Sequence, residues 1–281
     1  MMILIKHWRI KMMVGVRSGF LKTDHIASEA KEILILNLMP DRRHVEKNFF
    51  DLFNSTKRKL NLTFIVPATH KIKHDSLAVR QVYKTFADIK DNYYDALLVT
   101  GAPLEFIDFS QIDYFPEFLE ILKWRKKHVT FSTFECWSAM ALSRIEYHLD
   151  YSLERKKVSG IYETPVYSLL KGTKTIQVPQ SRYFKINGLA KSWQVITNDK
   201  DGSLISFDRT NRTFIITGHP EYDRETLANE YTRDLKRGLS IDEPRNYFDK
   251  NKIPQKTWSR NSTLLYSTWL DLAENCKLRQ F

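Results

Sequence analysis

The chain has 281 residues, 42% of them hydrophobic, which is enough for one large α/β domain with a substantial core or for two small domains. Its net charge is +11, but the basic residues are scattered among acidic ones and no nucleic-acid motif accompanies them. The charge therefore indicates a solvated basic surface, which also suits an anionic small molecule, and it argues against nucleic acid as a partner.

The cysteine content and the N-terminal segment indicate the compartment. Cys136 and Cys276 lie far apart without a CxxC spacing, which disfavours a disulfide framework and a structural metal site. Lys6, His7 and Arg9 interrupt the first apolar stretch before it could form a signal peptide, and no later run is long enough to cross a bilayer. We expect a soluble, cytoplasmic protein that binds neither a membrane nor a metal.

The predicted elements alternate between strands and helices. Residues 1–30 form an N-terminal extension in this interpretation, and residues 31–281 form a single α/β domain. Apolar runs bounded by turn residues predict buried strands, and apolar residues at helical spacing predict packed helices. In chain order we expect strand 32–38, helix 43–54, strands 62–66 and 96–100, helix 117–127, strands 129–134, 194–197, 204–207 and 213–217, and helix 257–277. The remainder of 158–208 is expected to be irregular and to cover one edge of the sheet.

This alternation predicts a doubly wound, mostly parallel sheet flanked by helices, with functional sites at the carboxyl ends of the strands. Three predicted strands end at residues that can carry chemistry. Thr100 and Gly101 follow one strand, Cys136 follows the next, and the segment 218–221 (GHPE) follows a third. The sequence therefore predicts a single active site at this edge of the sheet.

Cys136 stands between a predicted strand and the helix-forming run that begins at Trp137. A nucleophile at such a turn gains from the helix N-terminus, which favours a thiolate, and the next backbone N–H can stabilise an oxyanion. The usual flanking glycines are missing from FECWSAM, and a lone cysteine is more often a small buried hydrophobe.

His219 and Glu221 strengthen the interpretation of Cys136 as a nucleophile. Residues two apart in an extended segment project to the same side, so Glu221 can orient the imidazole of His219. A nucleophile, a base and an orienting carboxylate are then available at neighbouring strand ends. The histidines outside this context are expected to face solvent: His44, His70, His74 and His128.

Several segments in the same order resemble a known family. They are ILNLMP (35–40), TGAPLE (100–105), ECWSAMA (135–141), SR (181–182) and GHPEYDRETLANEYTRD (218–234). On these segments the chain resembles the homoserine O-acyltransferases of the homoserine trans-succinylase type. The fold of that family is similar to class I glutamine amidotransferases, which are flavodoxin-like.

The resemblance implies a ping-pong reaction in methionine or cysteine biosynthesis, with no bound cofactor and acyl-coenzyme A as cosubstrate. Cys136 would take the acyl group, and His219, oriented by Glu221, would activate the hydroxyl of L-homoserine. Backbone N–H groups of Leu104 and Trp137 would stabilise the oxyanions. The family also suggests a homodimer.

The resemblance also assigns residues to the two substrates. Arg233 matches the residue that holds the amino acid's carboxylate, and Lys157 and Ser181 match positions that line the same pocket. Glu105 stands where the family has glycine in succinyl-using members and glutamate in acetyl-using ones. A carboxylate there would fill space and repel the free carboxylate of succinyl-coenzyme A, so acetyl-coenzyme A is the expected donor.

The chain departs from the family pattern on the acceptor side. Ser138 replaces a glycine, segment 160–164 reads GIYET, and Tyr183 follows the SR pair. L-serine, one methylene shorter than homoserine, therefore stays an alternative acceptor, and succinyl-coenzyme A an alternative donor. Two more distant alternatives are a glutamine amidotransferase with the same three residues and a non-catalytic binding protein that uses the positive charge.

Overall fold

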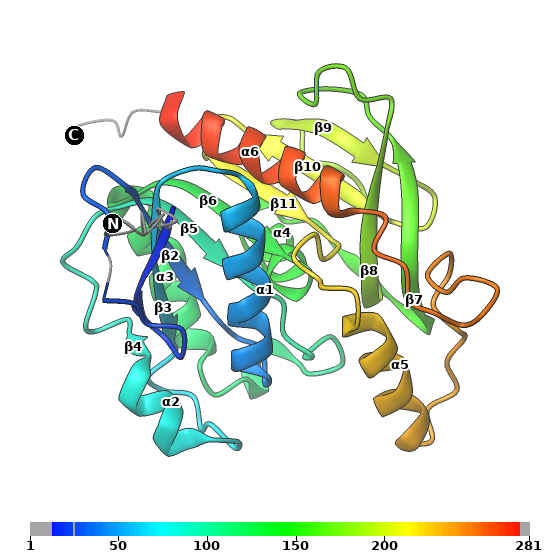
Figure 1. Ribbon diagram of the computed structural model, residues 1–281, viewed down its shortest axis with the longest axis horizontal. Coiled ribbons are helices and arrows are strands. Elements are labelled where there is room, and N and C mark those ends of the chain that lie inside the picture. Colours follow the sequence, from blue (N-terminus) through cyan, green and yellow to red (C-terminus); the bar gives the residue numbers. More distant parts are fainter. Residues whose placement is uncertain (1–12, 25, 276–281) are drawn as a thin grey trace, which may run out of the picture.

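The computed structural model describes residues 13–24 and 26–275, which form a layered α/β structure around a nine-stranded sheet (Figure 1). The strand order is β1-β3-β2-β5-β6-β11-β10-β9, with β4 paired to β3. All neighbours from β1 to β11 are parallel, and β10 and β9 add an antiparallel edge. The strands are β1 (Val14–Ser18), β2 (Lys31–Leu36), β3 (Leu60–Val66), β4 (Lys84–Thr85), β5 (Tyr94–Val99), β6 (Val129–Glu135), β9 (Trp193–Asn198), β10 (Leu204–Asp208) and β11 (Thr213–Ile216). The predicted doubly wound, mostly parallel sheet is confirmed.

Helices cover both faces of the sheet. One apolar core joins α1 and α6 to one face, where Phe53 and Trp269 are buried, and a second core joins α3 and α4 to the other, where Phe118 and Trp137 are buried. Figure 1 shows α1 and α6 crossing the near face. The helices are α1 (Arg42–Ser55), α2 (Ser76–Val82), α3 (Phe115–His128), α4 (Trp137–Tyr147), α5 (Thr226–Lys236) and α6 (Ser259–Asn275), with a short 3₁₀ turn η1 (Phe109–Gln111).

The chain reverses direction through the sheet between β2 and β5. From β2 it passes through α1 to β3 on one side, and from β5 through α3 to β6 on the other. Ligand sites in open α/β sheets lie at such a switch point, outside the carboxyl ends of the strands. The two loops are joined there, because the N–H of Leu38 donates to Oγ1 of Thr100 over 2.9 Å. The end of β6, which carries Cys136, is the next strand end along.

The segment expected to be irregular contains a long antiparallel ribbon. Strands β7 (Tyr151–Pro165) and β8 (Thr175–Ile186) pair on both sides of an interruption at residues 154–157, so the prediction of irregular structure was wrong there. The amino-terminal half of β7 is only partly buried and contains the charged run ERKK, so it lacks the apolar alternation that marks a half-buried strand. β8 packs against α4 and α6 and brings the ribbon beside the sheet.

Part of the expected N-terminal extension belongs to the sheet. Residues 14–18 form β1, which pairs with β3, and its Val14 and Val16 are fully buried. Residues 1–12 lie outside the described residues, and so do Cys276 and Lys277, the last two residues of the expected C-terminal helix. Within the described ranges, no helix is long and apolar enough to cross a membrane.

Candidate active site

Cys136 occupies a tight turn between β6 and α4. Its backbone angles, φ 51° and ψ −119°, are unusual for a residue with a side chain, and strain of this kind concentrates at functional sites. The turn is fastened on two sides. The N–H of Cys136 donates to the carbonyl of Ile216 over 2.8 Å, and Oγ of Ser138 accepts from the N–H of Glu135 over 2.9 Å. A serine hydroxyl thus holds the elbow in a sequence that lacks the usual glycines.

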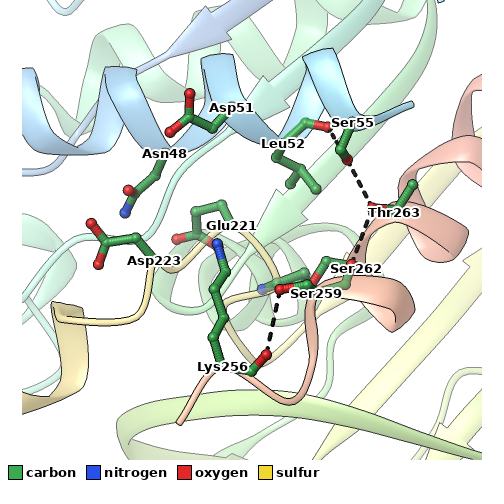
Figure 2. A pocket seen from close by; sticks show the side chains of 11 residues that line it. Asn48, Asp51, Leu52, Ser55, Glu221, Asp223, Lys256, Ser259, Ser262 and Thr263 are labelled. Atoms are coloured by element: carbon green, nitrogen blue, oxygen red, sulfur yellow. Dashed lines mark hydrogen bonds between the residues drawn. The ribbon is translucent and has the colours of Figure 1, made fainter. Parts of the chain in front are cut away.

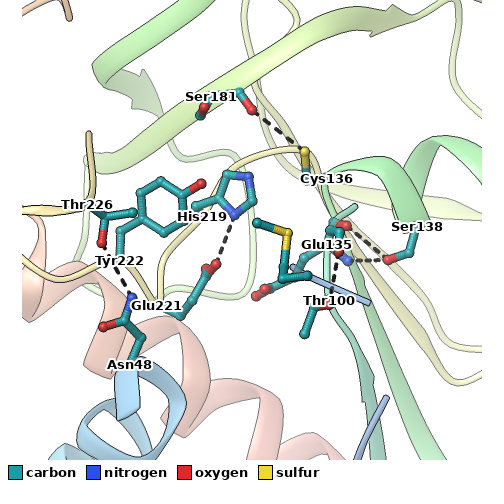
Figure 3. Close-up of polar contacts among 12 residues, drawn as sticks. Asn48, Thr100, Glu135, Cys136, Ser138, Ser181, His219, Glu221, Tyr222 and Thr226 are labelled. Atoms are coloured by element: carbon teal, nitrogen blue, oxygen red, sulfur yellow. Dashed lines mark hydrogen bonds and ion pairs between the residues drawn. The ribbon is translucent and has the colours of Figure 1, made fainter. Parts of the chain in front are cut away.

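His219 and Glu221 meet beside this turn (Figure 3). Nδ1 of His219 and Oε1 of Glu221 are 2.8 Å apart, which leaves Nε2 for other partners. The contact arises in a turn, since the N–H of Tyr222 donates back to the carbonyl of His219, and not in the extended segment expected from the sequence. A methyl group on Gly101 would lie 3.0 Å from Cβ of Cys136 and 3.2 Å from Cε1 of His219, so both side chains converge over this glycine.

The electrostatics of the pair favour a proton on the imidazole. Burial raises the pKa of the Cys136 thiol above its usual value, and the charge and hydrogen bond of His219 offset part of that rise. Burial also lowers the pKa of His219, but the negative charges of Glu221 and Cys136 outweigh it and hold that pKa well above its usual value. A thiolate formed at Cys136 is therefore stabilised by an imidazolium that Glu221 steadies.

The two expected oxyanion donors differ in the structure. Trp137 is the first residue of α4, so its N–H belongs to the first helical turn, which has no intrahelical acceptor. The N–H of Leu104, in contrast, already donates to the carbonyl of Ala102 over 2.9 Å. Only the Trp137 amide is open to an oxyanion without a change in the loop after β5.

Lys157 and Ser181, on β7 and β8, meet a buried carboxylate that the sequence analysis did not single out. This is Glu230 on α5, which accepts from Oγ of Ser181 and lies 3.3 Å from Nζ of Lys157. Lys157 also binds Asp234 over 2.8 Å. Tyr222 donates to Glu230 over 3.0 Å, and its ring stacks on His219 with the centroids 4.3 Å apart. The helical spacing of Glu230 and Asp234 is the signal that could have paired them.

Arg233 and Glu105 flank this group of charges. The guanidinium of Arg233 binds Asp234 over 2.8 Å, and 46% of its side chain is exposed. Glu105 is partly buried, and burial raises its pKa while the charges of Lys157 and His219 lower it. Residues expected from the sequence to bind the two substrates therefore surround one end of the sheet.

Arg182 is a further buried cation near the nucleophile. It is fully buried and donates to the carbonyls of Phe184 and Asp201 and to Oε1 of Gln180. Burial and the charge of Glu105 raise the pKa of the Cys136 thiol, and the positive charge of Arg182 joins His219 in opposing that rise. The sequence analysis noted this arginine only as part of the SR pair.

A small pocket of about 80 Å³ lies behind Glu221, between α1 and the start of α6 (Figure 2). Asn48, Asp223 and Ser262 line it, but Cys136 does not, so it is not the site of the proposed nucleophile. Among the described residues, no three His, Cys, Asp or Glu side chains gather in a way that could hold a metal ion.

Comparison with known proteins identifies the family. Residues 21–276 match the family model described as homoserine O-succinyltransferase. The chain belongs to this family. It is 38% identical to the homoserine O-acetyltransferase of Leuconostoc mesenteroides over 274 residues, which cover 93% of this chain and 90% of the relative. It is also 38% identical to the homoserine O-acetyltransferase of Lactococcus lactis subsp. cremoris over 255 residues, covering 86% of this chain and 80% of that one. The family expected from the sequence is confirmed.

Solved structures confirm the fold. A glutamine amidotransferase from Thermotoga maritima superposes with a TM-score of 0.60 at 9% identity, covering 88% of this chain and all of the other. One from Methylobacillus flagellatus gives 0.58 at 10% identity, covering 88% and 96%. At these identities the likeness concerns the fold alone, and the expected class I glutamine amidotransferase architecture is present.

Proposed function

We propose that this member of the homoserine O-succinyltransferase family transfers an acetyl group from acetyl-coenzyme A to the side-chain hydroxyl of L-homoserine, through an acyl-enzyme on Cys136. The observation that carries the proposal is the convergence of Cys136, His219 and Glu221 at one strand-end site, in a chain 38% identical to homoserine O-acetyltransferases. Such a reaction belongs to methionine biosynthesis. The homodimer and the cytoplasmic location stay predictions.

In the first half-reaction Sγ of Cys136 attacks the thioester carbonyl carbon. The carbonyl oxygen becomes an oxyanion, and the N–H of Trp137 donates a hydrogen bond to it. The carbon–sulfur bond to coenzyme A then breaks. The proton on His219 passes to the departing thiolate, which leaves a neutral imidazole beside the acyl-cysteine.

In the second half-reaction the acceptor hydroxyl gives its proton to Nε2 of His219 while its oxygen attacks the acyl carbon. Cys136 leaves as a thiolate, and the imidazolium–thiolate pair is restored. Arg233 holds the carboxylate of the amino acid, because a guanidinium matches it with two parallel hydrogen bonds. Lys157, Ser181 and Glu230 form the polar wall of the acceptor pocket.

Glu105 supports acetyl-coenzyme A as the donor. Its carboxylate lies within the electrostatic reach of His219 and Lys157, so a longer acyl chain ending in a carboxylate would meet both its bulk and its charge. Space and charge can be separated by substitution. Glu105→Gly removes both, whereas Glu105→Gln removes the charge and keeps the volume.

The test is a product analysis with each donor (acetyl- or succinyl-coenzyme A) and each acceptor (L-homoserine or L-serine). We expect O-acetylhomoserine as the main product of the natural chain. In Glu105→Gly we expect the ratio of succinyl to acetyl transfer to rise by about tenfold or more, as for a pocket difference of a few atoms. If only serine is acetylated, serine and not homoserine is the acceptor. If ammonia is released from glutamine and no acyl group is transferred, the protein is an amidotransferase and the proposal is wrong.

A further inference from the structure

Two carboxylate oxygens beside the candidate triad have no hydrogen-bond donor. One is Oε2 of Glu221, whose other oxygen faces His219. The other is Oε2 of Glu135, the residue before the nucleophile, whose other oxygen accepts from the hydroxyl of Tyr266 on α6. Glu135 is fully buried, and Glu221 is 6% exposed. Buried polar atoms without partners are rare in folded proteins, so the two orphan oxygens need an explanation.

The two carboxyl groups face each other. β6 and β11 are parallel neighbours in which Glu135 pairs with Ile216, five residues before Glu221. The side chains of Glu135 and Glu221 are close enough to hydrogen-bond and to act on each other's charge. Figure 3 shows both below the imidazole of His219. Two ionised carboxylates in such a place would repel each other, and neither could donate to the other.

A single proton on one of the two carboxyl groups removes the repulsion, and the surroundings indicate which group carries it. Glu221 faces His219, whose imidazolium compensates a negative charge. Glu135 forms no ion pair within the described part of the chain. The titratable groups that face it are Glu221 and His219, from the turn after β11, and Tyr266, from α6. Burial and the charge of Glu221 both raise the pKa of Glu135 well above its usual value. The neutral form therefore belongs on Glu135.

We propose that Glu135 is a positioning residue: as a neutral carboxylic acid, it donates a hydrogen bond from Oε2 to Oε2 of Glu221 and so fixes the carboxylate that orients His219. Both oxygens of Glu221 then have a donor, one from His219 and one from Glu135. Tyr266 holds the far oxygen of Glu135, so the chain of contacts runs from α6 through the sheet to the nucleophile. The inference rests on the proposed roles of Cys136 and His219, but its first test needs no turnover.

That test is infrared difference spectroscopy of the full-length protein at pH 8, where an exposed glutamate is ionised. We expect the carbonyl stretch of a neutral carboxylic acid in the natural chain and its loss in Glu135→Gln. The exposed Glu120→Gln variant is the control and should keep the band. Tyr266→Phe should shift the band to higher frequency, because it removes the hydrogen bond to the carbonyl oxygen. A band that survives unchanged in Glu135→Gln would overturn the proposal.

The second test asks whether the donor matters to the nucleophile. The rate of alkylation of Cys136 by iodoacetamide is followed by peptide mass mapping. In Glu135→Gln an amide N–H can still donate to Glu221, so we expect a rate within about twofold of the natural chain. In Glu135→Met, of similar size without a donor, we expect a loss of about tenfold or more, the usual worth of a hydrogen bond to a charged group.

The outcomes separate the donor from mere packing. Equal rates in Glu135→Met and the natural chain would contradict a positioning role, and so would a Gln variant as slow as the Met variant. If the Met variant does not fold, the infrared comparison of Glu135→Gln with Tyr266→Phe still decides whether Glu135 is a neutral acid held by Tyr266. If the carbonyl band disappears in Glu135→Gln but the natural chain transfers no acyl group, this inference holds and the proposed function fails.

Discussion

At the scale of residues, the absence of a side chain at Gly101 lets Cys136 and His219 approach each other. A Cβ at this position would lie 3.0 Å from Cβ of Cys136, which is closer than an ordinary van der Waals contact, and 3.6 Å from its sulfur. Its backbone is not in the left-handed region, so a larger residue at this position would be opposed by lack of space and not by backbone conformation. The side chains of Cys136 and His219 would have to move to accommodate it.

We therefore expect Gly101→Ala to separate thiol and imidazole. The acyl-transfer rate constant kcat should fall by at least about tenfold, since small misplacements of reacting groups are costly. The midpoint of thermal unfolding should change little, because the site, and not the core, absorbs the methyl group. Full activity in Gly101→Ala would mean that catalysis does not depend on the close approach of Cys136 and His219 described here.

His44 was expected to face solvent, but it binds Thr226 over 3.0 Å and lies 3.4 Å from Asp223. The hydrogen bond to Asp223 raises the pKa of His44. Burial raises the pKa of Asp223, but the hydrogen bonds from His44 and Thr226 outweigh it and leave that pKa well below its usual value. The sequence could not show this contact, because 179 residues separate the partners.

The contribution of this pair to stability depends on pH. Because folding raises the pKa of His44, its contribution to stability is fully present below the unfolded pKa of about 6.5. That contribution is lost as the pH rises through the pKa of the folded state. The depressed pKa of Asp223 stabilises above its unfolded value of about 4 and is lost as the pH falls. His44→Ala should therefore lower the free energy of unfolding by about 1 kcal/mol at pH 6 and by less at pH 9. Urea titrations measure this, with the exposed His74→Ala as control. An equal loss at both pH values would contradict the linkage.

At the scale of elements, α5 is fastened to the β7–β8 ribbon by a buried charge cluster. Lys157 reaches from β7 to Glu230 and Asp234, and the three side chains are 7%, 12% and 4% exposed. Burial raises the pKa values of Glu230 and Asp234, but Lys157 and the other partners of each carboxyl outweigh it and hold both below their usual range. The cluster positions the helix that carries Arg233.

Lys157→Met should leave the carboxylate of Glu230 without its ion-pair partner and leave Asp234 with Arg233 alone. The cost of breaking such a pair is about 3 kcal/mol or more in the free energy of unfolding, measured by urea titration at pH 7. Lys156→Met is the matched control, since Lys156 is 69% exposed and pairs with the exposed Asp242, and it should cost less than about 1 kcal/mol. The difference should shrink at acid pH, where the carboxylates bind protons. Equal losses of unfolding free energy in the two variants would contradict the role of the buried charge cluster in holding α5.

The elements differ in how far the sequence predicts them. Strands β2, β3, β5, β6 and β11 were predictable because each is almost entirely buried, and burial on both faces makes each a short stretch rich in apolar residues. The β7–β8 ribbon was not, since most of its first strand is only partly buried and shows no clear apolar pattern, and the ribbon forms by pairing of two segments that the sequence does not mark as partners. The same ribbon carries Lys157 and Ser181, which the family resemblance assigned to one pocket, whereas their contacts with Glu230 were not predicted.

At the scale of the whole molecule, the sheet topology brings the site together. Cys136, Gly101 and His219 follow β6, β5 and β11, which are neighbours in the sheet although up to 118 residues separate them in the chain. Alternating strands and helices predict this convergence, because parallel strands end at one edge. Tyr266 and Glu135 add a contact from the C-terminal helix that no sequence pattern marks.

The central claim is that Cys136 carries the acyl group between donor and acceptor. Intact-mass spectrometry after brief mixing with acetyl-coenzyme A, with no acceptor present, tests it most directly. We expect one added acetyl group, mapped to Cys136, absent in Cys136→Ser and removed within the mixing time when L-homoserine is added. Folded, active protein that transfers acetyl groups without ever forming this adduct would contradict the account.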